Sequence, residues 1–241
     1  TSSSRSSLAT LQESDLAEMA RRLATRLTEP FGVIPADARQ FAASPAMRCI
    51  LKSFDARRSM ASDMQLAARL CLAQLVEQDP GFYPAWAHLA IMTLGEHAGT
   101  TQQSPSQQDD ADTMRPPLDR ALAAALTAVR LAPSGARAYQ ALMKVLLLRG
   151  ATDEAIQMGR EAQARNPYDP EIMAEVDALY VRIDRPLEGL PLLERATSLS
   201  VARPPRYDFY AFLGAYLVGA GKVSDSYAGM LAADSSSLSL L

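Results

Sequence analysis

Few side chains in this sequence could bind a metal or attack a substrate. His88 and His97 are the only histidines, and no cysteine or acidic residue stands at ligand spacing from them, so no metal site is predicted. The densest acidic group is Asp109, Asp110 and Asp112. It lacks the glycine turn and the distal glutamate of a helix-loop-helix calcium site. We therefore expect no metal and no cofactor.

Motifs of the common catalytic sites are also missing. The sequence has no glycine-rich phosphate loop, and no nucleophile stands in a recognisable motif with histidine and a carboxylate. The carboxylates are scattered along predicted helices, where solvation explains them. We predict that the chain is not an enzyme.

Two cysteines, Cys49 and Cys71, are too few for a disulfide framework. We expect them to face each other across one helical hairpin. The favoured interpretation is a pair of small buried hydrophobic side chains, because a bridge would need an oxidising compartment.

Composition narrows the class of protein. The 241 residues are 48% hydrophobic and rich in Ala and Leu, which favours an all-helical chain. The net charge of −3 gives no bias toward nucleic acid, and no apolar run approaches the roughly 20 residues that span a bilayer. The start has neither Met nor an apolar signal core, so we expect a soluble part of a longer chain, either cytoplasmic or periplasmic.

Residues 136–169 have the pattern of two short antiparallel helices. The first carries an apolar face that begins at Tyr139 and continues at spacings of three and four. Gly150 lies in the predicted turn, and Pro167 stops the second helix. The pattern of a helix pair is clearest in this stretch of the sequence.

An aromatic residue, leucines, a turn glycine, Ala155, Ala162 and then Pro167 follow one another over these 34 residues. This order resembles the tetratricopeptide repeat. The stretch DPGFYPAWAHLA, which contains Trp86, resembles the same repeat. The resemblance implies an all-α fold, a right-handed superhelical solenoid of antiparallel helix pairs with about four to five repeats and an N-terminal helix.

The resemblance also implies a domain organisation. Residues 1–10 are expected to be a flexible linker, 11–43 an N-terminal helix with a connecting loop, and 44–241 the solenoid. The predicted repeats cover about 45–80, 83–133 with an insertion at 99–115, 136–169, 170–203 and 207–234.

The order of LQESDLAEMARRLATRLTEPFGVI, DPGFYPAWAHLA, a polar insertion and PLDRALAAALTAVRLAP resembles one group of bacterial signalling proteins. In that group, tetratricopeptide repeats follow an adenylate-cyclase-like or winged-helix output domain. No output domain is present in these residues, so neither cyclase activity nor DNA binding carries over to them.

In such an array, the first helices of the repeats line a concave groove. Counting from the large residue of each repeat, the predicted groove positions are Ala87, Ile91, Leu94, Gln140, Lys144, Leu147, Ala174, Ala178, Val181, Ala211, Ala215 and Val218. Most are small or apolar. They predict an apolar groove for an amphipathic helix or peptide, and they argue against a basic clamp for an acidic C-terminal peptide, which needs several basic side chains.

The functional prediction is a non-catalytic protein-interaction or regulatory repeat domain, a sensory or scaffolding part of a larger bacterial signalling protein. Its partner would be a protein or peptide, with no nucleic acid bound and no membrane insertion. The alternative is an assembly scaffold, for example in envelope polysaccharide or secretion machinery, that forms homo-oligomers through its C-terminal end.

Overall fold

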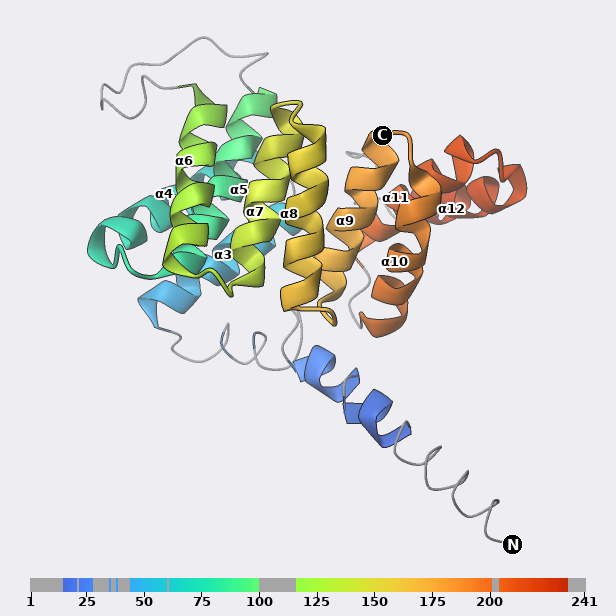
Figure 1. Ribbon diagram of the computed structural model, residues 1–241, viewed down its shortest axis with the longest axis horizontal. Helices are drawn as coiled ribbons and strands as arrows, with labels where there is room; N and C mark the ends of the chain where they lie inside the picture. Colours follow the sequence, from blue (N-terminus) through green and yellow to red (C-terminus); the bar gives the residue numbers. More distant parts are fainter. Residues whose placement is uncertain are drawn as a thin grey trace, which may run out of the picture.

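Figure 1 shows the fold as a computed structural model. It describes residues 15–20, 22–27, 35, 38, 44–59, 61–99, 116–200 and 204–233. Residues 15–20 and 22–27 are helical. The predicted linker, most of the connecting loop and the insertion after Gly99 lie outside the described residues.

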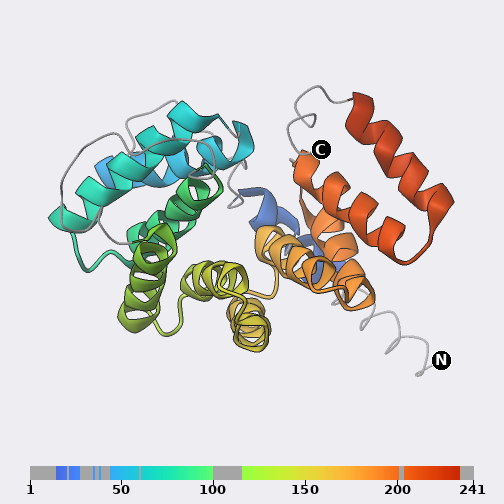
Figure 2. The same ribbon diagram turned by 90° about the horizontal axis from the view of Figure 1, so that it is seen from above.

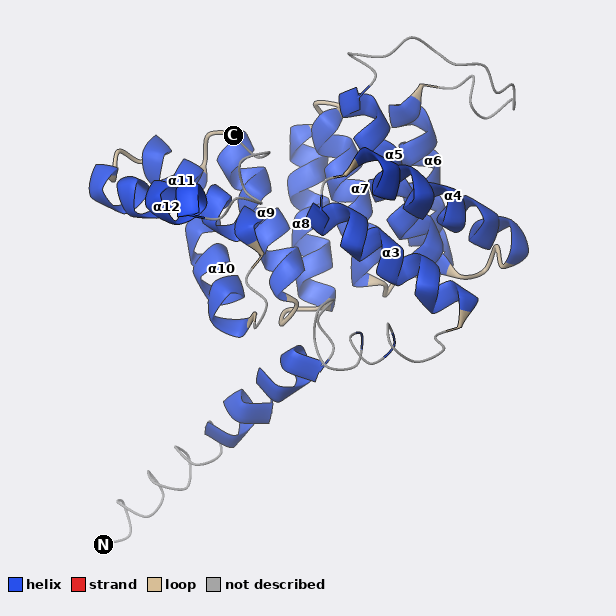
Figure 3. Ribbon diagram, turned by 180° about the vertical axis from the view of Figure 1, so that it is seen from behind, coloured by secondary structure: helices blue, strands red, loops and turns tan. Residues whose placement is uncertain are grey.

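Within the described ranges from residue 44 onward, ten helices follow one another and form five pairs. They are α3 (Pro45–Ser59) with α4 (Ser62–Gln78), α5 (Tyr83–Gly99) with α6 (Pro117–Leu131), α7 (Ala136–Leu148) with α8 (Thr152–Arg165), α9 (Pro170–Arg182) with α10 (Pro186–Leu199), and α11 (Pro205–Leu217) with α12 (Gly221–Ala233). Figure 2 shows the pairs following one another along an arc. The described part of the chain contains helices, turns and connections but no strand (Figure 3). The expected all-α solenoid of helix pairs is confirmed.

Turn chemistry explains where the helices begin and end. Five of them start at a proline, a residue that is tolerated in the first turn because its missing N–H would have no helical partner there. Gly150 has a φ of 78°, so the turn between α7 and α8 needs the left-handed conformation that glycine adopts at low cost. The Asp169 side chain caps α9 by accepting hydrogen bonds from the backbone N–H groups of Glu171 and Ile172.

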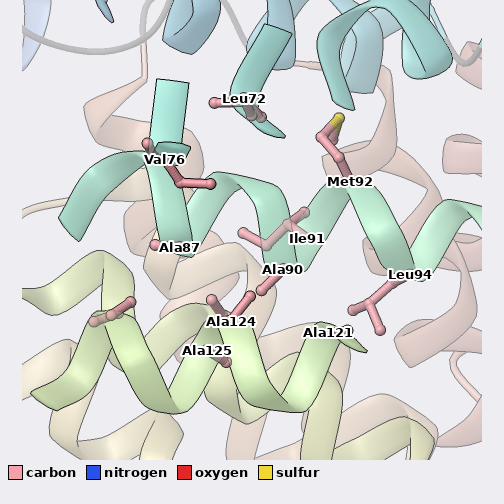
Figure 4. Packing of buried hydrophobic residues seen from close by; sticks show 14 of the residues in the cluster. Leu72, Val76, Ala87, Ala90, Ile91, Met92, Leu94, Ala121, Ala124 and Ala125 are labelled. Atoms are coloured by element: carbon pink, nitrogen blue, oxygen red, sulfur yellow. The ribbon is translucent and has the colours of Figure 1, made fainter. Parts of the chain in front are cut away.

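Alanines dominate the contacts between neighbouring helices. Figure 4 shows Ala90 of α5 facing Ala121, Ala124 and Ala125 of α6, with Leu72 and Val76 of α4 nearby. Three of these four alanines are completely buried, and Ala124 is almost so. A methyl side chain lets two helix axes approach closely, so the pairs stack without large gaps.

Helices α9 and α10 approach each other closely at Gly189. A Cβ atom added at Gly189 would lie 2.9 Å from the Cα atom of Asp177, so only glycine fits there. Both carboxylate oxygens of Asp177 are buried and have no hydrogen-bond partner among the described residues. Burial raises the pKa of Asp177 to about 7. This carboxyl group is therefore a buried acid whose charge depends on pH near neutrality.

Cys49 and Cys71 are joined by a disulfide that links α3 to α4, with their Cα atoms 5.5 Å apart. The two residues do face each other across one helical hairpin, as expected. The interpretation as two separate buried thiols is wrong, because the antiparallel packing of α3 on α4 brings the two Cα atoms within the range that a disulfide spans.

Among the described helices, none is both long enough and apolar enough to span a membrane.

Candidate functional site

The concave face holds a pocket of about 1000 Å³. Its walls come mainly from the first helix of each described pair, namely α3, α5, α7, α9 and α11, and Gln65 of α4 and Pro204 also line it. Part of the lining is apolar and includes Ile91, Leu94, Met143, Leu147 and Leu179. The charged part consists of Asp55, Arg57, Arg58, Lys144, Glu175, Arg182 and Arg206.

The predicted groove positions divide into two groups. Those that line the pocket are Ile91, Leu94, Lys144, Leu147 and Ala178. Those outside the lining are Ala87, Gln140, Ala174, Val181, Ala211, Ala215 and Val218; all are buried except Val218, which is exposed near the end of α11. The position directly after the large residue of each repeat is buried in all four repeats, because it packs beneath neighbouring helices instead of facing the concave side.

Two carboxylates of α9 organise the charged part of the site. Glu171 and Glu175 lie one turn apart on the same face of the helix. Their side chains are 3% and 5% exposed. Arg57 of α3 forms ion pairs with both, and its Nη2 atom lies 2.8 Å from Oε1 of Glu175. The contact with Glu175 joins residues 118 positions apart, and both ion pairs connect the first helix pair to the fourth.

Three more cations reach the same carboxylates. Arg137 of α7 contacts Oε2 of Glu171 at 3.1 Å through Nη1, and Oδ2 of Asp169 at 2.6 Å through Nη2. Lys144, also on α7, contacts Oε2 of Glu175 at 2.5 Å. Arg206 of α11 lies 3.4 Å from Oε1 of Glu171. The network thus ties four of the five first helices together across the concave face.

The pKa values show how the carboxylates are held in their charged form. Burial acts to raise the pKa of Glu175, but Lys144 and Arg57 outweigh it and hold this pKa at about 2. Burial opposes the charge of Glu171 in the same way, yet Arg57 and Arg137 hold its pKa well below the usual range. Both glutamates are therefore ionised at neutral pH.

Lys144 responds differently to the same network. Burial lowers its pKa, and the attraction of Glu175 only partly offsets this effect. Arg57 and Arg206 lower the pKa of Lys144 further. The pKa of Lys144 is therefore lowered chiefly by burial, with a smaller contribution from the two neighbouring arginines.

His88 lies behind the network and is buried. Its Nδ1 atom is 2.6 Å from Oγ of Ser53, and its ring meets Phe54 edge-on at 4.8 Å between centroids. Burial, followed by the charges of Arg137 and Arg57, lowers the pKa of His88 to about 3. The imidazole is therefore neutral at physiological pH. Within the described ranges, no group of His, Cys, Asp and Glu side chains is arranged to hold a metal ion.

The pocket lining combines predicted apolar side chains with charged ones, most of which were not among the predicted groove positions. Sequence reasoning missed Arg57, Glu171, Glu175 and Arg206. The four-residue spacing of the glutamates on a predicted first helix was an available signal. Arg57 and Arg206 could not be placed by repeat register. Arg57 lies in the first predicted repeat, at 45–80, in which no groove positions could be counted, and Arg206 is the last residue of the irregular connection ARPPR.

No family model and no curated protein sequence matches the chain. Solved structures do match it. The TPR protein TTC0263 of Thermus thermophilus is 19% identical, with a TM-score of 0.53 over 73% of this chain and 84% of that one. A chain of the APC/C hetero-tetramer Cut9–Hcn1 is 16% identical, with a TM-score of 0.57 over 76% of this chain and 32% of that one. At this identity the similarity establishes the fold, which is the repeat fold expected from the sequence.

Proposed function

We propose that this chain, which has the fold of tetratricopeptide repeat proteins, is a non-catalytic interaction domain that binds a segment of another protein in its concave pocket. The observation that supports this most is the lining of the pocket, to which all five helix pairs contribute. A volume of about 1000 Å³ is at the upper end of the range for ligand pockets, roughly 300–1000 Å³.

The occupant would be a peptide or one face of an amphipathic helix. Apolar side chains such as Ile91, Leu94 and Leu147 offer contacts for aliphatic residues of the partner. Cut9 was solved in complex with Hcn1, so a solenoid of similar fold takes part in a protein assembly there. Because its sequence resembles one group of bacterial signalling proteins, the domain would serve as a sensory or scaffolding part of a larger protein of that kind.

Blocking the pocket tests this function. Ala178 lines the pocket and is 5% exposed, so Ala178→Arg would fill it with a long charged side chain. Leu187→Arg is the matched control, because Leu187 of α10 is 73% exposed and lies outside the pocket lining. Both variants are first checked for unchanged helical content by circular dichroism.

The immobilised wild-type domain and both variants are then incubated with host lysate, and bound proteins are identified by mass spectrometry. We expect at least one partner that the wild type and Leu187→Arg capture and Ala178→Arg does not. Capture that is equal for all three would contradict binding in the pocket.

The scaffold alternative is supported by exposed apolar residues at the last helix pair. Tyr216 and Leu217 of α11, Val218 directly after it, and Val223 and Met230 of α12 are between 38% and 66% exposed. If this surface joins copies of the chain, Leu217→Asp should reduce the mass measured by light scattering to that of a monomer. A wild-type domain that is monomeric at a concentration of about 100 μM, well above the Kd of a stable assembly, would exclude this alternative.

A further inference from the structure

The pocket carries an excess of positive charge, although the whole chain is acidic. Five cations and two carboxylates line it, and cations remain in excess when Glu171, which pairs with Arg57 and Arg206 from outside the lining, is included; the net charge of the chain is −3. The cations come from α3, α7, α9 and α11. Charge of one sign that is concentrated in a concave site attracts ligands of the opposite sign.

Several of these cations keep hydrogen-bonding capacity that the protein does not use. Lys144 has three N–H donors, of which one bonds to Glu175. The Nε atom of Arg206 is buried and has no hydrogen-bond partner among the described residues. Arg182 is exposed at the pocket wall, and within the described structure no ion pair to it is found.

The stability of the helices does not explain this arrangement. Arg206 lies in the first turn of α11, where the positive end of the helix dipole disfavours a cation. Lys144 is only partly exposed and lies near Arg57 and Arg206, and both arginines oppose its charge. A carboxylate brought into the pocket would relieve both unfavourable interactions.

We propose that the pocket recognises an acidic segment of a partner protein, in which Asp or Glu side chains alternate with aliphatic ones. The carboxylates contact Lys144, Arg182 and Arg206. The aliphatic side chains contact Ile91, Leu94 and Leu147. The cations belong to different helices, so they fit several side-chain carboxylates spread along a segment better than one C-terminal carboxylate. The inference rests on the proposed function and names the chemistry of the occupant.

A peptide array tests this chemistry directly. Random peptides of about 12 residues with amidated C-termini, and a second set with free C-termini, are probed with the labelled domain. We expect the bound amidated peptides to be enriched in Asp, Glu and aliphatic residues. Their affinity should fall several-fold between about 50 and 300 mM salt, because ions screen the attraction between charges.

Reversing the charge of Arg182, which is exposed at the pocket wall, gives a variant that should still fold. Arg182→Glu should weaken binding of the best acidic peptide roughly tenfold, because one favourable contact becomes repulsive. Arg160→Glu makes the same change in net charge on the exposed side of α8, outside the pocket lining, and should change the affinity less than about twofold.

The outcomes separate the two proposals. Bound peptides that lack an acidic preference but are lost with Ala178→Arg would overturn this inference and leave the proposed function standing. An equal effect of the two charge reversals, or binding restricted to peptides with free C-termini, would also overturn it. If no peptide binds the wild-type domain, both proposals fail.

Discussion

The ion pairs of Glu175 should contribute about 3 kcal/mol to folding, and Glu175→Gln should remove this contribution. The estimate comes from the pKa of Glu175, which is about 2 in the folded protein against a usual value of 4.5, at about 1.36 kcal/mol for each pKa unit. It agrees with the cost of about 3–5 kcal/mol for removing one partner of a buried ion pair. In the variant, Lys144 and Arg57 would remain partly buried beside a neutral amide.

The sign of the pH dependence provides a second check. Because the folded pKa is lowered, the stabilisation is fully present above about pH 4.5 and is lost as the pH falls toward 2. The difference between the wild type and Glu175→Gln should therefore shrink from about 3 kcal/mol at pH 7 to about 2 kcal/mol at about pH 3.5. Urea denaturation followed by circular dichroism at the two pH values measures it.

Glu194→Gln is the control for this experiment. Glu194 is exposed on α10, and no ion pair to it is found in the described part of the chain, so the substitution should change stability by less than about 0.5 kcal/mol. A loss below about 1 kcal/mol for Glu175→Gln at pH 7 would refute the reasoning, as would a loss that does not depend on pH.

Two further predictions concern the buried acid and the disulfide. Asp177 has a raised pKa of about 7, so its charged form opposes folding increasingly as the pH rises from about 4 to 7. The free energy of unfolding of Asp177→Asn, measured by urea titration relative to the wild type, should rise by about 2–3 kcal/mol between about pH 5 and pH 8, because asparagine cannot ionise. If this difference between variant and wild type does not change with pH, Asp177 does not titrate in the fold. Removing the bridge with Cys49→Ala and Cys71→Ala together should cost about 3 kcal/mol, and a reducing agent should destabilise the wild type but not the double variant. Two free thiols in protein purified without a reducing agent would contradict the bridge.

Local signals in the sequence were sufficient to predict the repeat fold. The apolar spacing that begins at Tyr139, the turn at Gly150 and the stop at Pro167 act over a few residues, so each can be recognised from its own neighbours. The alanines that lie between the helices are also recognisable from their local spacing in the sequence. Only some of the proposed groove positions line the pocket. Counting from the large residue of each repeat gives the face of one helix, but it does not show which neighbouring helix packs over that face.

The charged pocket depended on the tertiary structure. Arg57 and Glu175 are 118 residues apart, and neither has a local partner that would mark it in the sequence. They meet because small rotations between successive helix pairs add up to a curvature that brings the side chain of Arg57 on α3 within reach of α9. Tertiary packing likewise buries Asp177 and brings the two cysteines within bonding distance. The sequence by itself therefore determined the helices and their pairing, while the curvature of the whole array decided which charges face one another.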